Sequence, residues 1–102
     1  MPEMTFSVRW PDGRVEECYS PSLVMHDHLT PATSYRVDDF VRRATVALGE
    51  ASERVRARYG FACSASAASL ERIERRAASF DPRDSVDVLD MQPPLPAPQE
   101  AP

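Results

Sequence analysis

The sequence predicts an α+β fold with two layers, a small antiparallel sheet packed against an antiparallel pair of helices. Apolar residues alternate with polar ones near both ends of the chain, over residues 5–10 and 85–91, as in half-buried strands. Between residues 37 and 80 they recur at three- and four-residue steps, the spacing of amphipathic helices. We therefore expect an N-terminal β-hairpin and a C-terminal strand to form the sheet and two central helices to cover it.

The first strand is predicted over Thr5–Trp10 and the returning strand over Arg14–Tyr19, with Pro11-Asp12-Gly13 as the turn. Two registers are open. A two-residue Asp12-Gly13 turn places Val15 and Tyr19 on the face of Phe6, whereas a three-residue turn with a bulge at Gly13 places Cys18 there. The first register buries more apolar surface and is the one we predict, although Pro11 suits the second.

The segment 20–36 has no clear period. Ser20 and Pro21 fit the cap and first position of a short helix. Leu23 to Leu29 is too short to distinguish a helical turn from a strand. We expect Tyr35 to lead directly into the first long helix.

That helix is predicted over Val37–Tyr59. Asp38 and Asp39 lie in its first turn and Arg56 in its last, which suits the helix dipole. Gly60 follows at the position of a left-handed cap. One face is apolar and consists of Val37, Phe40, Val41, Ala44, Ala47, Leu48, Ala51, Val55 and Tyr59.

A second helix is predicted to begin at Ser64 or Ser66 and to end near Phe80. The short connection predicts that the two helices are antiparallel. The final strand is predicted over Ser85–Met91. The apolar stripe of the second helix consists of Ala67, Leu70, Ile73, Ala77 and Phe80.

Length and composition predict a single α+β domain over residues 1–91. Residues 92–102 contain five prolines in eleven positions, which predicts a Pro-rich flexible tail.

The formal net charge of −4 argues against general affinity for nucleic acid or for an anionic membrane. No apolar segment approaches the roughly 20 residues needed to span a bilayer, and no segment resembles a signal peptide. Two cysteines in such a chain are typical of free thiols in a reducing compartment, so we expect a cytoplasmic protein.

Metal-ligand residue types gather only at Cys18, His26, His28 and Cys63. On a strand the two histidines would share a face, whereas on a helix they would point apart. The strong CxxC and HExxH spacings are missing from the sequence, so we predict neither a metal nor a cofactor.

Cys63 precedes a predicted helix start, where a thiol can become nucleophilic. A catalytic thiol needs a base, and only His26 and His28 are available. The simpler interpretation is a small apolar residue packed beside Phe61. No catalytic residue is therefore predicted.

Arg54, Arg56 and Arg58 crowd the end of the first helix. They form a solvated helix face or a docking surface for an acidic partner.

Three stretches resemble a known family: TFSVRWPDG at 5–13, CYSPSLV at 18–24 and ASERVRARYGFACS at 51–64. Together they are similar to short bacterial nitrogen-starvation response proteins, known from mycobacteria and other bacteria, over about residues 4–90. The resemblance implies a gene cluster for nitrile or cyanide use that encodes a nitrilase, a radical-SAM protein, an acetyltransferase-like protein and a flavoprotein. It implies a pathway and supplies no catalytic residue.

We therefore expect a non-catalytic accessory protein of that pathway, which binds a partner such as the nitrilase, the radical-SAM protein or the flavoprotein, or associates with itself. An exposed edge strand or the arginine-bearing helix face would make the contact. The alternative is a small metal- or ligand-binding protein with thiol chemistry at Cys18, His26, His28 and Cys63. A nucleic-acid-binding regulator conflicts with the acidic charge balance.

Overall fold

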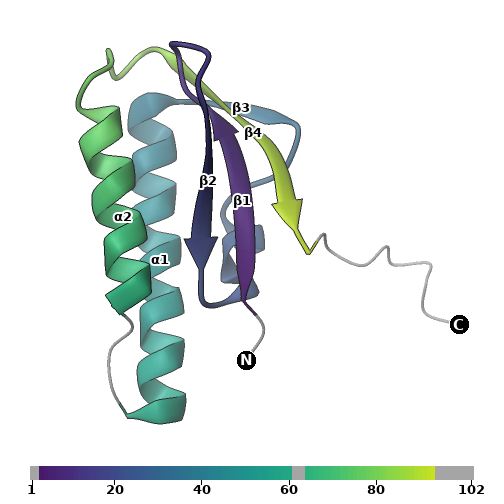
Figure 1. Ribbon diagram of the computed structural model, residues 1–102, viewed down its shortest axis with the longest axis vertical. Coiled ribbons are helices and arrows are strands. Elements are labelled where there is room, and N and C mark those ends of the chain that lie inside the picture. The colour runs from purple at the N-terminus through teal and green to yellow at the C-terminus, as the bar shows by residue number, and fades with distance from the viewer. Residues whose placement is uncertain (1–2, 61–63, 94–102) are drawn as a thin grey trace, which may run out of the picture.

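The computed structural model describes residues 3–60 and 64–93 and has the predicted α+β class, with two helices on one side of an antiparallel sheet (Figure 1). The elements in chain order are β1 (Met4–Arg9), β2 (Val15–Ser20), a 3-10 helix η1 (Leu23–Asp27), β3 (Thr33–Arg36), α1 (Val37–Tyr59), α2 (Ser64–Ala77) and β4 (Ser85–Gln92). Strand β4 ends at Gln92, inside the predicted tail, and residues 94–102 of that tail lie outside the described residues.

The sheet contains a fourth strand, β3, that the sequence pattern did not predict. Its strand order is β2-β1-β4-β3, with every neighbouring pair antiparallel. Strand β3 has only four residues and sits where Tyr35 was expected to lead directly into the helix. It is a strand because β4 supplies a partner, with Thr33 opposite Val88, and such long-range pairing leaves no local period in a short segment.

The register predicted for the hairpin is wrong. The Trp10 N–H donates to the Arg14 carbonyl at 2.9 Å and the Gly13 N–H donates to the Trp10 carbonyl at 2.8 Å, which makes a three-residue turn. Gly13 has φ 87°, a left-handed value that glycine adopts without strain. Pro11 sets the first turn position, and turn geometry overrides the extra burial that the other register offered. Cys18 therefore faces Phe6 in the core, and the side chain of Val15 is 58% exposed.

The short helix η1 begins later than predicted. Ser22, rather than Ser20, caps it, and its hydroxyl accepts from the Val24 N–H at 3.3 Å. Ser20 instead donates its hydroxyl to the Ser22 carbonyl at 2.8 Å. The turn buries Val24 and Met25 against the rest of the core.

Helix α1 has the predicted bounds, and Gly60 caps it with φ 81° and an N–H bond to the Arg56 carbonyl at 2.8 Å. Helix α2 differs from its predicted stripe, because Ala67 is exposed and Ser66 is buried. The Ser66 hydroxyl donates to the Leu48 carbonyl of α1 at 2.9 Å. A small polar residue satisfied in this way lets the two helices approach closely.

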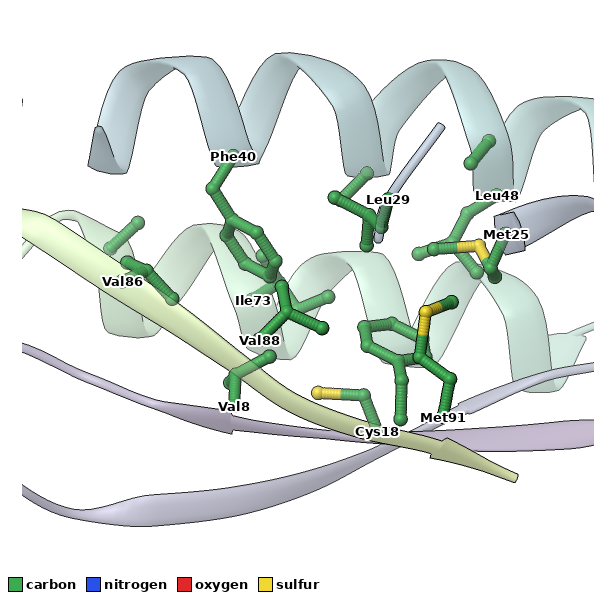
Figure 2. Close-up of a cluster of buried hydrophobic side chains, with 14 of the residues drawn as sticks. Val8, Cys18, Met25, Leu29, Phe40, Leu48, Ile73, Val86, Val88 and Met91 are labelled. Atoms are coloured by element: carbon green, nitrogen blue, oxygen red, sulfur yellow. The ribbon is translucent and has the colours of Figure 1, made fainter. Parts of the chain in front are cut away.

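The core lies between the helices and the inner sheet face, as Figure 2 shows. Trp10 stacks on Phe80 with a centroid distance of 5.8 Å and meets Phe40 edge-on at 5.7 Å. Phe80 makes this contact from beyond the end of α2 at Ala77, although it was predicted inside the helix. The core cluster consists of Met4, Phe6, Val8, Trp10, Cys18, Met25, Leu29, Val37, Phe40, Ala44, Ala47, Leu48, Ile73, Ala77, Val86, Val88 and Met91.

Candidate functional site

Cys18 is a core residue, 5% exposed on the inner face of β2. Burial chiefly raises the pKa of its thiol from an ordinary 9.0 to about 12, the carboxylate of Glu16 raises it further, and the positive charge of Arg72 acts in the opposite direction. The thiolate is the nucleophile and the metal ligand. Cys18 is therefore a protonated, packed side chain at neutral pH.

The two histidines of η1 bond to different elements. The Pro93 carbonyl accepts from Nε2 of His26 at 2.9 Å, which requires the proton to be on Nε2. His28 instead bonds through Nε2 to the Glu50 carboxylate on α1. A 3-10 helix turns about 120° per residue, so positions two apart point away from each other.

Three of the four metal candidates, Cys18, His26 and His28, lie in the described part of the chain, and they do not form a metal site there. Within residues 3–60 and 64–93, no group of three or more His, Cys, Asp or Glu side chains is placed to hold a metal ion. Cys63 lies outside the described residues, so its relation to His26 and His28 stays a prediction.

The arginines predicted to dock a partner lie on the exposed end of α1. Arg56 pairs with Glu53 at 3.7 Å, and the guanidinium of Arg58 lies 5.9 Å from the centroid of the Tyr59 ring. Arg54 borders a shallow depression on the helix beside Val46. The three arginines therefore lie on a solvent-exposed face of α1.

A second basic set lies beside the open edge of the sheet. A hollow of about 490 Å³ separates the hairpin turn from the C-terminal half of α2. Four arginines and two acids line it, together with a hydroxyl and an aromatic ring: Arg14, Arg72, Arg75, Arg76, Asp12, Glu16, Ser79 and Phe80.

The two acids in this hollow are already engaged within the chain. Glu16 accepts from the Trp10 indole N–H at 2.9 Å and lies 3.9 Å from the Arg76 guanidinium. Asp12 accepts from the Arg14 backbone N–H at 3.0 Å. By contrast, Arg72 is exposed and forms no ion pair within the described part of the chain. The hollow therefore has uncompensated positive charge.

Strand β2 forms one edge of the sheet, with no strand of the described residues on its outer side. The bond between Trp10 and Arg14 fixes which backbone groups face β1, since bonded and non-bonded positions alternate in an antiparallel ladder. Glu16 and Cys18 consequently bond to β1. The N–H and C=O groups of Val15 and Glu17 point away from the sheet, where an added strand would meet them.

From the sequence, an edge strand or the arginines of α1 were expected to contact a partner, and the arginines of α2 were not singled out. Arg72, Arg75 and Arg76 look like the ordinary solvated face of an amphipathic helix. Only the position of α2 alongside β2 shows that part of this face borders a sheet edge. The available signal was the basic charge of residues 37–80, with eight arginines against six acids.

A family model described as nitrogen starvation-induced protein NitG matches residues 5–91. The chain belongs to the NitG family. This NitG match covers β2, β3 and both long helices, and all but one residue of β1 and of β4. No curated protein and no solved structure matches the chain. None of the described helices of this NitG-family chain combines the length and the hydrophobicity of a membrane span.

Proposed function

We propose that this chain is an accessory protein of the nitrogen-starvation response that binds a partner protein by strand addition at the edge of β2. The single observation that supports this proposal is an open strand edge next to a hollow with uncompensated positive charge. Edge strands with outward-pointing backbone groups are templates for an extended segment of another chain.

Strand β2 suits this role better than the other edge of the sheet. It has six residues, whereas β3 has four, so β2 offers the longer ladder. Val15 presents an apolar side chain beside the outward backbone groups, 58% exposed. An added strand would cover that side chain and gain hydrophobic free energy as well as hydrogen bonds.

The partner is expected to be a different protein. Glu16 and Glu17 are adjacent on β2, and pairing two copies of this strand edge to edge would bring four carboxylates together. Like charges across a strand pair are unfavourable. Among different proteins, the resemblance implies an enzyme of nitrile or cyanide assimilation, namely the nitrilase, the radical-SAM protein or the flavoprotein.

A pair of substitutions at Glu17 tests strand addition. Glu17→Pro removes the outward N–H, and Glu17→Thr removes the same charge but keeps the N–H in a good strand former. Loss of one interface hydrogen bond, about 1.4 kcal/mol, weakens binding about tenfold. The tagged chain is purified from nitrogen-starved cells with a photo-crosslinker at Val15, and the crosslinked site on the partner is mapped.

The proposal predicts that the Thr variant retains a crosslinked pathway enzyme and that the Pro variant loses it. Circular dichroism and the thermal midpoint of both variants control for folding. Equal capture by the two variants, or a crosslink that joins two copies of this chain, contradicts the proposal.

A further inference from the structure

Helix α2 packs against strand β2 and runs in the opposite direction (Figure 1), which places two arginines along β2. Arg76 lies next to Glu16, at 3.9 Å between Nε and Oε1. Four residues earlier on the helix, Arg72 is close enough to the next inward-facing position of the strand, Cys18, to affect its thiol electrostatically. Both arginines line the hollow.

The spacing of these arginines matches the repeat of a β-strand. Four residues of an α-helix advance about 6 Å along its axis. Two residues of a strand advance about 6.6–6.8 Å, and side chains two apart point to the same face. On a strand added to β2, consecutive helix-facing side chains would therefore lie opposite Arg76 and Arg72.

We infer that the segment added at β2 has two acidic residues separated by one residue, whose carboxylates enter the hollow and pair with Arg72 and Arg76. This inference rests on the proposed function, because the same edge positions the segment. Carboxylate–guanidinium bonds are charge-assisted and directional, and arginine is suited to hold them. The residue between the two acids faces the outer side of the sheet, next to Val15 and Glu17, and is not restricted to an acid.

The pairing also explains why the hollow contains acids of its own. Glu16 lies 3.9 Å from the Arg76 guanidinium on the strand side, and the Trp10 indole N–H donates to Glu16. Arg76 is consequently only 33% exposed, compared with 74% for Arg75 and 75% for Arg14. A guanidinium that is partly buried before binding loses less side-chain entropy when a ligand pairs with it.

Two synthetic peptides of identical composition test the inference. Both are threonine-rich strand formers with two glutamates, which are separated by one threonine in the first peptide and adjacent in the second. Adjacent glutamates point to opposite faces, so only one reaches the hollow. Titration into the full chain, followed by backbone amide and arginine Nε–H NMR signals, is expected to show about tenfold tighter binding of the first peptide.

Variants then identify the arginines involved. Arg72→Gln is expected to remove the tenfold preference for spaced glutamates, whereas Arg54→Gln, the same change of charge on the exposed end of α1, leaves it unchanged. Arg72 has no ion pair within residues 3–60 and 64–93, so the first substitution leaves the fold intact. Arg72→Glu is expected to prefer a peptide in which the glutamate facing it is replaced by arginine.

Equal binding of the two isomers, or no NMR shifts at millimolar peptide, overturns the inference. Inorganic pyrophosphate that binds as tightly as the spaced peptide also overturns it, since the hollow is then a site for small anions. If partner capture is sensitive to Glu17→Pro but not to Arg72→Gln, the acidic spacing is wrong and strand addition stands. If Glu17→Pro has no effect on the partner, the proposed function itself fails.

Discussion

The Trp10 indole N–H donates to the Glu16 carboxylate at 2.9 Å, across the turn that joins β1 to β2. This bond links the core to the hollow, because Trp10 is 1% exposed and stacks on Phe80 while Glu16 also faces Arg76. One residue of this pair is therefore part of the hydrophobic core, and the other lies in the charged hollow beside the open strand edge.

Glu16→Ala leaves a buried indole N–H without its acceptor, so it is expected to lower the free energy of unfolding by about 1–3 kcal/mol. Glu16→Gln keeps an acceptor oxygen and should cost less. Urea unfolding followed by the fluorescence of Trp10, the only tryptophan in the chain, measures both variants. Equal stability of wild type and Glu16→Ala would show that the bond does not contribute.

The raised pKa of the buried Cys18 thiol predicts that the fold loses stability at alkaline pH. The pKa of the thiol is raised to about 12 in the folded chain from 9.0, so between those values the unfolded chain has lost the proton and the folded chain retains it. The contribution of the Cys18 thiol to the free energy of unfolding is complete below pH 9. It falls by about 1.4 kcal/mol per pH unit as the pH rises toward 12. Denaturant unfolding of wild type and of Cys18→Ala between pH 9 and 12 measures how much of the pH-dependent loss of stability comes from this thiol.

The same burial predicts that native Cys18 is alkylated far more slowly than free cysteine at pH 8, and at an ordinary rate once urea unfolds the chain. Mass spectrometry of the modified peptide follows this site separately from Cys63. Rapid alkylation of Cys18 in the folded chain would contradict its placement in the core.

Gly49 and Gly60 are expected to respond to alanine in opposite directions. A Cβ at Gly49 meets nothing within 4 Å, so Gly49→Ala in the middle of α1 should stabilise the fold by about 1 kcal/mol. Gly60 caps the same helix at φ 81°, where alanine is strained, so Gly60→Ala should destabilise it by about 1 kcal/mol. Thermal unfolding compares the two, and a destabilising Gly49→Ala contradicts the first expectation.

Asp39 predicts a loss of stability in acid. Hydrogen bonds from Arg43 and Arg42 lower the pKa of this carboxyl below its ordinary 3.8. Its contribution is therefore present above pH 3.8 and disappears as the pH falls through the lowered value. Asp39→Asn should be less stable than wild type at pH 6. The difference in the free energy of unfolding should become smaller in acid. It should also become smaller at high salt, because salt screens the ion pairs of Asp39 with Arg42 and Arg43 near the surface.

Local sequence signals predicted the elements that are long or end at a distinctive residue. Helix α1 has six turns of apolar periodicity and a glycine at its left-handed cap, so its bounds follow from the sequence alone. The predictions fail where residues distant in the sequence determine the local structure. Strand β3 exists because β4 pairs with it, and Ser66 is buried because a carbonyl of α1 accepts its hydroxyl.

The site was predictable only in part, for the same reason. An edge strand and a basic helix face were expected as contact surfaces, but nothing in the local pattern distinguishes Arg72 and Arg76 from Arg54, Arg56 and Arg58. The distinction comes from the packing of α2 against β2. The hairpin register depends on Pro11 and Gly13, and it decides that Val15 and Glu17, rather than Cys18, face outward on the edge strand.

Hydrogen–deuterium exchange of the edge amides tests partner binding at β2 most directly. In the free chain, the Val15 and Glu17 amides are expected to exchange faster than those of Glu16 and Cys18, which bond to β1. In the complex with the captured partner, the exchange of Val15 and Glu17 is expected to slow at least tenfold. Unchanged exchange at these two amides in a saturated complex would contradict strand addition.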